Sequence, residues 1–291
     1  MTMPSVSTTT ETDTTSPDAT REILGLESQC ERVVVNDGAG QVVFRRLGSG
    51  SPLILLHGGH GSWLHWIRNA KQLAQSHTVW MPDMPGYGES SAVASGELTE
   101  LVTTLYRCLM RVVGPTGAWA LVGFSFGGVV AGCLSTMDEG IGRLALIGPV
   151  GHGARRRQLS NPLPWKHLAP EDRSETWQQV MRHNLLAQML HKRSAVDDLA
   201  LEVHWRSCLM SRFHSKRYSR SALLRESLKS YKGQALLLWG EDDVTASPEV
   251  FDLAAWATAG NCQLVVQPDC GHWAMYEASG EIEAQIHRFF D

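Results

Sequence analysis

The chain has 291 residues, of which 43% are hydrophobic, and a formal net charge of −4. This length and composition predict a globular protein with one large domain, or one domain that carries an insertion, built around a full hydrophobic core. The weakly acidic charge excludes the basic surface that nucleic-acid binding requires. The chain holds no uninterrupted apolar stretch of about 18 residues, so we expect no membrane partner.

Residues 1–27 are rich in threonine and serine, and we expect them to form a flexible N-terminal tail. The segment lacks the basic and apolar regions of a secretory signal, and its Glu11, Asp13 and Asp18 disfavour an organelle transit peptide. The six cysteines show no C-x-x-C pair, which in a long chain is typical of reduced thiols. These features predict a cytoplasmic protein.

Residues 28–150 alternate strand and helix patterns. Two β-branched runs flank Asp37-Gly38-Ala39-Gly40, which predicts a hairpin. Short apolar runs that are typical of strands covered on both faces follow at 52–59, 77–83, 119–123 and 143–149. Helical patterns cover roughly 66–75, 100–113 and 126–137. This alternation predicts an α/β fold with a doubly wound, mostly parallel sheet.

The alternation stops at residues 151–231, which show helical runs near 174–190 and 196–212 and no convincing strand. We interpret this segment as an inserted helical cap. Its basic run, Arg155-Arg156-Arg157, is typical of a solvated turn rather than a binding patch. The alternation resumes at 232–291, with strand patterns at 234–240 and 262–267 and helical patterns at 247–257 and 281–290. Residues 28–150 and 232–291 are therefore predicted to form one core.

The G-x-S-x-G pattern of residues 123–127 lies between a predicted strand and a predicted helix. In a strained strand-to-helix turn only very small residues fit two positions before and after the serine, which explains Gly123 and Gly127. Such a turn lifts the hydroxyl of Ser125 above the sheet edge, beside the free N–H groups of the next helix. The simpler interpretation is a glycine-rich turn. Residues elsewhere in the chain are needed to choose between this turn and one that presents a catalytic serine.

A hydroxyl needs a base to become nucleophilic, and the base needs a partner that fixes its tautomer. Glu241, Asp242 and Asp243 directly follow one late predicted strand, and His272 follows the next. Each group alone is typical of a solvated turn. Their order after Ser125 and their position at the carboxyl ends of strands favour a catalytic serine, acid and histidine.

Transition-state stabilisation requires donors for a developing oxyanion. The segment LLHGGHGS (55–62) follows the first buried strand, and its glycines allow a backbone N–H to point into the site. We predict that Gly59 supplies one donor and the backbone N–H of Phe126 the second. His57 is interpreted as a structural residue that supports this loop, because no H-E-x-x-H motif or nearby carboxylate cluster indicates a metal.

Together these segments resemble the α/β-hydrolase fold family, in the family's order and over nearly the whole chain beyond the tail. The resemblance implies that Ser125 is the nucleophile, His272 the base and Asp243 the orienting acid. The family usually places the acid three residues after the glycine of W-G-x-x-D, which here selects Asp243 and leaves Asp242 as the alternative.

Within the family, the chain is similar to hydrolases that cleave carbon–carbon bonds in ring-fission products of aromatic breakdown, and to related esterases. The segment GHWAMYE contains Trp273, and Arg206 in HWRSCLM falls where that group carries an arginine for the substrate carboxylate. Phe124 stands where the group usually has asparagine. The resemblance thus implies substrate-binding roles for Phe124, Arg206 and Trp273, while Arg206 is alternatively a surface residue of the cap.

The predicted function is that of a serine hydrolase acting on a small-molecule acyl compound, either an ester or the C–C bond of a keto acid. It requires no cofactor and no metal. Trp165, Trp177 and Trp205 in the cap indicate an apolar or aromatic substrate, or simply pack in the cap core. The alternatives are a ligand receptor on a hydrolase scaffold and a lyase or perhydrolase that uses the same residues. The sequence does not determine whether the protein forms a homo-oligomer.

Overall fold

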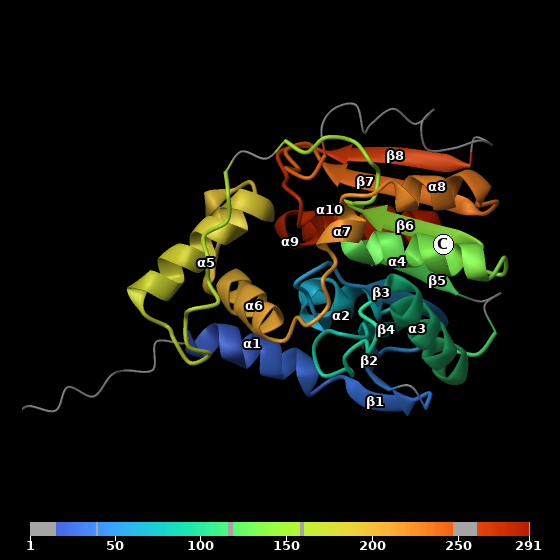
Figure 1. Cartoon of the computed structure of the whole chain (residues 1–291), viewed down its shortest axis with the longest axis horizontal. Helices are drawn as coiled ribbons and strands as arrows, with labels where there is room; N and C mark the ends of the chain where they lie inside the picture. Colours follow the sequence, from blue (N-terminus) through green and yellow to red (C-terminus); the bar gives the residue numbers. More distant parts are fainter. Residues whose placement is uncertain (1–15, 39, 116–118, 158–159, 247–260, 291) are drawn as a thin grey trace, which may run out of the picture.

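The computed structural model describes residues 16–38, 40–115, 119–157, 160–246 and 261–290 (Figure 1). In this part of the chain the strands form one sheet in the order β1-β2-β4-β3-β5-β6-β7-β8. The first two strands pair antiparallel through the predicted hairpin, β2 also runs antiparallel to β4, and all other pairs are parallel. The predicted α/β, doubly wound, mostly parallel sheet is confirmed. Its strands are β1 (Glu31–Asn36), β2 (Gln41–Leu47), β3 (Ser51–Leu56), β4 (His77–Asp83), β5 (Ala120–Phe124), β6 (Arg143–Ile147), β7 (Gln234–Gly240) and β8 (Cys262–Gln267).

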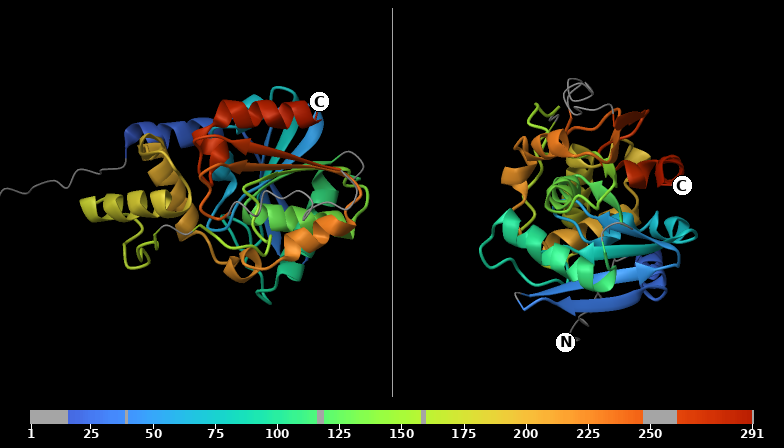
Figure 2. Two further views of the ribbon diagram at one scale, coloured as in Figure 1. Left: turned by 90° about the horizontal axis from the view of Figure 1, so that it is seen from above. Right: turned by 90° about the vertical axis from the view of Figure 1, so that its right-hand side faces the viewer.

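Helices cover both faces of the sheet, as the view from above in Figure 2 shows. Because successive side chains of a strand point to opposite faces, Leu53 and Leu55 of β3 enter one core cluster and Ile54 and Leu56 enter the other. The first cluster lies under η1 (Trp63–Trp66), α2 (Ala70–Leu73), α9 (Ala274–Glu277) and α10 (Ser279–Phe290). The second lies under α3 (Leu98–Val112), α4 (Phe126–Met137) and α8 (Leu223–Ser230).

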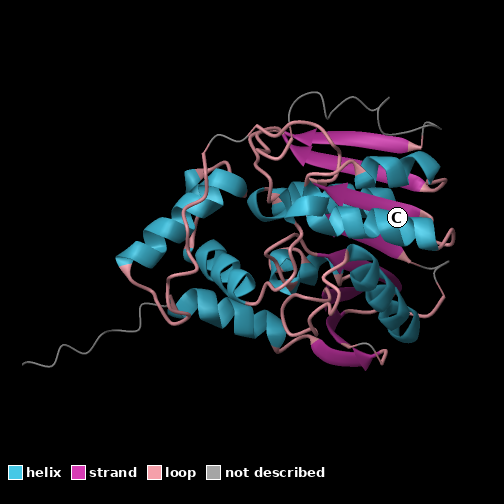
Figure 3. Cartoon of the chain, viewed as in Figure 1, coloured by secondary structure: helices cyan, strands magenta, loops and turns pink. Residues whose placement is uncertain are grey.

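A separate group of helices lies beyond the ends to which the strand arrows point (Figure 3). It contains α5 (Glu175–Gln188), η3 (Arg193–Ala195) and α6 (Asp198–Leu209). Trp177 and Trp205 are buried between these helices with their rings 6.3 Å apart in a T-shaped arrangement. These two tryptophans therefore pack in the helical core, as the simpler interpretation predicts.

The later helices of residues 151–231 lie elsewhere. Both α7 (Lys216–Ser219) and α8 contact α4, on the face of the sheet that α4 covers. We therefore propose a cap that is shorter than the predicted segment and contains α5, η3 and α6. The helix predicted at 247–257 and the tail residues 1–15 lie outside the described residues.

The end of the predicted tail is a helix, α1 (Pro17–Glu27), which corrects the expectation of a flexible segment through residue 27. Proline at the first helical position is favourable, and Ala19, Ile23 and Leu26 bury one face of the helix, partly against α6. Glu27 at its end pairs with Arg45 of β2 at 2.7 Å. The helix thus contacts both the cap and the core.

A second contact joins cap and core at the N-terminus of α6. Asp197 caps this helix by accepting the N–H of Ala200 at 2.8 Å. The same carboxylate accepts hydrogen bonds from Arg68 at 2.5 Å and from the Tyr276 hydroxyl at 2.6 Å. Since Arg68 and Tyr276 belong to the core, α6 is held against it by a charged and hydrogen-bonded cluster. No described helix is long and apolar enough to cross a membrane.

Candidate active site

The backbone around Ser125 forms a tight turn between β5 and α4. Ser125 has φ +53°, which is a strained region for a residue with a side chain. A Cβ atom on Gly123 would lie 2.7 Å from the Gly127 carbonyl oxygen, and one on Gly127 would lie 2.3 Å from the Leu56 carbonyl oxygen. The steric need for glycine at both positions, predicted from the sequence pattern, is therefore present in the backbone.

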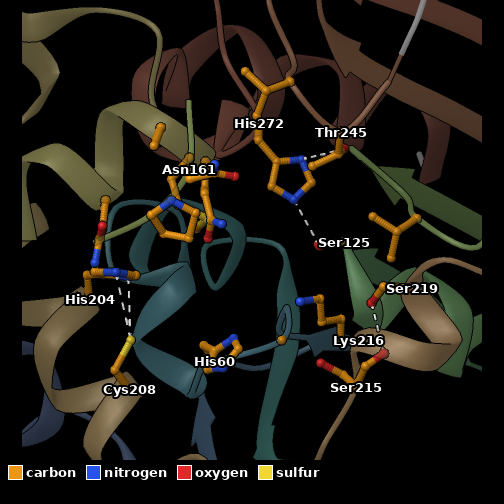
Figure 4. A pocket seen from close by; sticks show the side chains of 18 of the residues that line it. His60, Ser125, Asn161, His204, Cys208, Ser215, Lys216, Ser219, Thr245 and His272 are labelled. Carbon is orange, nitrogen blue, oxygen red and sulfur yellow. Dashed lines mark hydrogen bonds between the residues drawn. The ribbon is translucent and has the colours of Figure 1, made fainter. Parts of the chain in front are cut away.

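Three side chains from different strand ends meet at this turn. The Oγ atom of Ser125 lies 2.9 Å from Nε2 of His272 (Figure 4). Nδ1 of His272 lies 2.8 Å from Oδ2 of Asp243. Asp243 and His272 are buried, with 1% and 4% of their surfaces exposed. Asp242 instead points toward His191, whose Nε2 lies 3.6 Å from its Oδ2. The structure thus brings Asp243, not Asp242, to His272.

Thr245 supports the second oxygen of the Asp243 carboxylate. Its backbone N–H and its hydroxyl both donate to Oδ1 of Asp243, each at 2.7 Å. Burial alone would raise the pKa of Asp243, but the adjacent His272 and the hydrogen bonds from Thr245 outweigh burial and hold this pKa below its ordinary value. Asp243 is therefore ionised at neutral pH, with one oxygen on His272 and the other on Thr245.

Thr245→Val is expected to lower kcat/KM about tenfold, because it removes one hydrogen bond to a buried carboxylate and leaves the backbone bond intact. Thr245→Ser keeps the hydroxyl and is expected to retain most of the activity. Steady-state hydrolysis of an aryl ester by the three proteins measures both effects. Equal activity of Thr245→Val and wild type would show that the hydroxyl does not position Asp243.

The two predicted oxyanion donors lie beside Ser125. Gly59 lines the cavity that contains Ser125, and Phe126 is the first residue of α4. Neither backbone N–H has an acceptor within the described part of the chain. Unpaired N–H groups next to a nucleophile are free to bind a developing negative charge. Their role as the oxyanion hole remains a prediction.

His57 holds the loop that carries Gly59. Its Nδ1 lies 2.8 Å from the Gly58 carbonyl oxygen, and its Nε2 accepts the N–H of Met84 at 3.0 Å. One ring nitrogen thus donates and the other accepts, which only the neutral imidazole can do. Burial lowers the pKa of His57 to about 4. The structural role predicted for His57 is confirmed by these contacts.

The buried histidines make the stability of the fold sensitive to acid. Burial also lowers the pKa of His204 to about 4. An unfolded histidine has a pKa near 6.5, so between about pH 6.5 and 4 the unfolded chain binds protons that the folded chain excludes. We expect the free energy of unfolding to fall over this range, by up to about 3 kcal/mol for each of the two residues.

Urea unfolding at pH 7.5, 6 and 5 measures this loss. His57→Gln keeps a donor and an acceptor but cannot titrate, so its unfolding free energy is expected to depend less steeply on pH than that of the wild type. Equal slopes for His57→Gln and wild type would contradict the prediction.

A cavity of about 690 Å³ opens in front of Ser125 and His272 and reaches the cap residues Trp165, Asn184 and Met189. Figure 4 shows Lys216 extending into this cavity below Ser125. Trp165 alone of the three highlighted cap tryptophans lines it. The cavity size suits a small organic molecule.

The three side chains predicted to bind substrate lie elsewhere. Arg206 donates to Glu202 at 2.6 Å. It is not one of the residues that line the cavity. Trp273 is buried and donates to the His65 carbonyl oxygen at 3.1 Å. Phe124 is buried, with its ring 5.0 Å from that of His272. In this structure Arg206 belongs to an ion pair and the two aromatic rings are buried beside the site, so their contact with substrate stays a prediction.

Sequence reasoning missed the polar residues that do reach the cavity. Thr245 follows Asp243 by two positions, but this signal can be used only once the acid is known. Lys216 and Arg220 lie in a region without a recognisable motif. Arg156 lines the cavity, so the interpretation of its basic run as a solvated turn is wrong for this residue.

A strained serine joined through a histidine to a buried aspartate is the arrangement that serine hydrolases use. The sequence profile of the alpha/beta hydrolase family matches residues 53–285, and the chain belongs to that family. Its relatives and structural neighbours are hydrolases, and the protein is a hydrolase enzyme.

Two bacterial relatives illustrate the similarity. A 2-hydroxy-6-oxo-6-phenylhexa-2,4-dienoate hydrolase from Burkholderia cepacia is 32% identical over 252 residues, which cover 79% of this chain and 84% of that protein. A 2-hydroxy-6-oxononadienedioate/2-hydroxy-6-oxononatrienedioate hydrolase from Comamonas testosteroni is 29% identical over the same shares of the two chains, 79% and 84%.

Solved structures show the same fold. A meta-cleavage product hydrolase from Pseudomonas fluorescens IP01 has a TM-score of 0.69 and 22% identity, over 89% of this chain and 97% of that chain. An esterase from Rhodococcus sp. ECU1013 has a TM-score of 0.71 and 19% identity, over 90% of this chain and 98% of that chain. At these identities the likeness concerns the fold.

Proposed function

We propose that the protein is a serine hydrolase that cleaves a small acyl compound with Ser125, His272 and Asp243. The observation that carries the proposal is the 2.9 Å contact between Ser125 Oγ and His272 Nε2 at the mouth of a cavity. The names of the relatives support the C–C bond of a keto acid as the first candidate bond. A carboxylic ester is the second candidate, because an esterase shares the fold.

For an ester, His272 removes the proton from Ser125 as the serine oxygen attacks the substrate carbonyl. Asp243 holds the Nδ1–H tautomer and stabilises the imidazolium that forms. The N–H groups of Gly59 and Phe126 bind the oxyanion, and His272 then protonates the leaving group. Water hydrolyses the acyl-enzyme by the same route. For a C–C bond, His272 delivers its proton to carbon, and Ser125 either becomes acylated or activates the water.

Labelling with a fluorophosphonate probe tests the nucleophile. We expect mass mapping to find the adduct on Ser125 of the wild type and no adduct on folded Ser125→Ala. The kcat/KM values for an aryl ester and a 2-hydroxy-6-oxo-dienoate acid then identify the preferred bond. Folded wild-type protein that resists the probe and turns over neither compound would contradict the proposal and favour the ligand receptor.

A further inference from the structure

The cavity in front of Ser125 carries positive charge without matching negative charge. Arg156, Lys166, Lys216 and Arg220 line it, whereas no described Asp or Glu does. None of these four cations has a carboxylate within ion-pair distance in the described part of the chain. Arg156 is half-buried and the other three are exposed, whereas the buried Arg45 is paired with Glu27. The cavity is therefore suited to an anion.

The two arginines among these four cations also line a second hollow. This hollow of about 330 Å³ is bounded by Gly153, Ala154, Arg155, Arg156, Ser219 and Arg220, and we call it the arginine hollow. It shares Arg156, Ser219 and Arg220 with the cavity in front of Ser125. A molecule in the cavity can therefore extend one end toward the hollow.

The arginines of the hollow repel one another. Arg156 donates to the Ser219 carbonyl oxygen at 3.2 Å, which is its one hydrogen bond among the described residues. Burial and then the charge of Arg220 lower the pKa of Arg156 and outweigh the opposing charge of Asp243, so the positive charge of Arg156 is held at a cost in free energy. An anion bound between the guanidinium groups would remove this repulsion and accept charge-assisted hydrogen bonds.

The arginine hollow is connected to the catalytic acid by hydrogen bonds. The N–H of Ala154 donates to Nδ1 of His152 at 3.0 Å, and Nε2 of His152 lies 3.1 Å from the Thr245 carbonyl oxygen. Thr245 in turn binds Asp243. The loop that carries the arginines is thus held by the residues that hold the triad acid.

We propose that Arg155, Arg156 and Arg220 form an anion subsite, which binds a carboxylate or phosphate group of the acyl substrate at a distance from the scissile carbonyl. This assignment rests on the proposed hydrolase function for the identity of the ligand. The hollow offers N–H donors and positive charge and no described carboxylate, so it discriminates against neutral and cationic groups.

Binding is tested first without turnover. Isothermal titration of Ser125→Ala with glutarate and with inorganic phosphate, at constant ionic strength, is expected to show saturable binding of at least one of the two anions. The tighter anion identifies the carboxylate or the phosphate as the natural group. Arg220→Gln is expected to weaken this binding about tenfold, as loss of a charge-assisted hydrogen bond requires.

The matched control is Arg157→Gln. It removes the same charge from the loop that carries Arg155 and Arg156, but Arg157 is bound to the Glu241 carbonyl oxygen at 2.9 Å and does not line the hollow. We expect its anion affinity to equal that of the parent protein. Absence of saturable binding, or equal losses in Arg220→Gln and Arg157→Gln, would overturn the subsite.

Kinetics then identify the bound group as part of the substrate. We expect wild type to hydrolyse 4-nitrophenyl hemiglutarate, or the butyrate ester with a terminal phosphate, with a KM about tenfold lower than that of neutral 4-nitrophenyl butyrate. Arg156→Gln and Arg220→Gln are expected to abolish this preference by raising the KM of the anionic ester. Arg157→Gln keeps the preference.

The outcomes separate the two proposals. If the anions bind but no ester or keto acid is hydrolysed, the proposed function fails and the arginine hollow remains an anion site. If the neutral ester is hydrolysed and the anionic ester has no advantage, the subsite fails and the hydrolase remains. Saturable binding of phosphate that does not compete with the anionic ester also overturns the assignment to the substrate.

Discussion

Ser125→Ala is expected to lower the kcat of the preferred substrate by roughly 10⁴- to 10⁶-fold while the protein stays folded. In the proposed mechanism the Oγ atom attacks the carbonyl, and no other described hydroxyl lies within hydrogen-bond distance of His272 Nε2. Removing it leaves the oxyanion donors and the cavity intact. The residual rate should therefore exceed the uncatalysed rate in water. Single-turnover and steady-state rates measure the loss.

Ser135 provides the matched control for this substitution. It is a buried serine within α4, and its hydroxyl donates to the Gly132 carbonyl oxygen at 2.8 Å, away from the site. We expect Ser135→Ala to keep wild-type kcat, and circular dichroism to show all three proteins folded. A folded Ser125→Ala protein that retains more than about one hundredth of the activity would contradict the nucleophile assignment.

Asp243→Asn is expected to lower kcat about 10³- to 10⁴-fold, because it reverses the tautomer of His272. Thr245 donates two hydrogen bonds to Oδ1 of Asp243, so an asparagine at this position must turn its oxygen toward Thr245. Its NH₂ group then faces Nδ1 of His272, which becomes the acceptor. The proton moves to Nε2, where it blocks acceptance of the Ser125 proton.

Asp242→Asn tests the alternative acid with the same chemical change one residue earlier. Asp242 lies near His191 on the surface, so its loss is expected to change kcat less than about twofold. The pH–rate profile of both variants against wild type supplies the measurement. A large loss in Asp242→Asn with a small one in Asp243→Asn would reverse the assignment of the acid.

The strands and the elbow could be predicted because local chemistry determines them. The run at β3 has no polar residue between Leu53 and Leu56, which fits a strand covered by helices on both faces. The elbow requires glycine on both sides of Ser125 because backbone carbonyls leave no room for a Cβ atom. Each of these constraints acts within a few residues, so it is visible in the sequence.

The substrate-facing side chains could not be predicted in this way. The sequence alone suits Arg206 to a carboxylate ligand, but its Nε–H is bound by Glu202 one helical turn before it, on a carboxylate that Arg173 also binds. Arg156 and Arg220 face one cavity although 63 intervening residues separate them, a proximity that only the packed fold creates. Similarly, α1 was missed because its apolar face is recognised only against α6, which lies far along the chain.

The strand order also determines where this protein can be shortened for expression. The family profile begins at residue 53, after β1, β2 and α1. Trimming to that point would remove the strand whose Val43 pairs with Asp83, and β4 would become an outer strand with a row of unpaired backbone groups. It would also uncover the side of α6 that α1 covers. An exposed edge at β4 promotes aggregation, so a shortened protein should begin before Pro17.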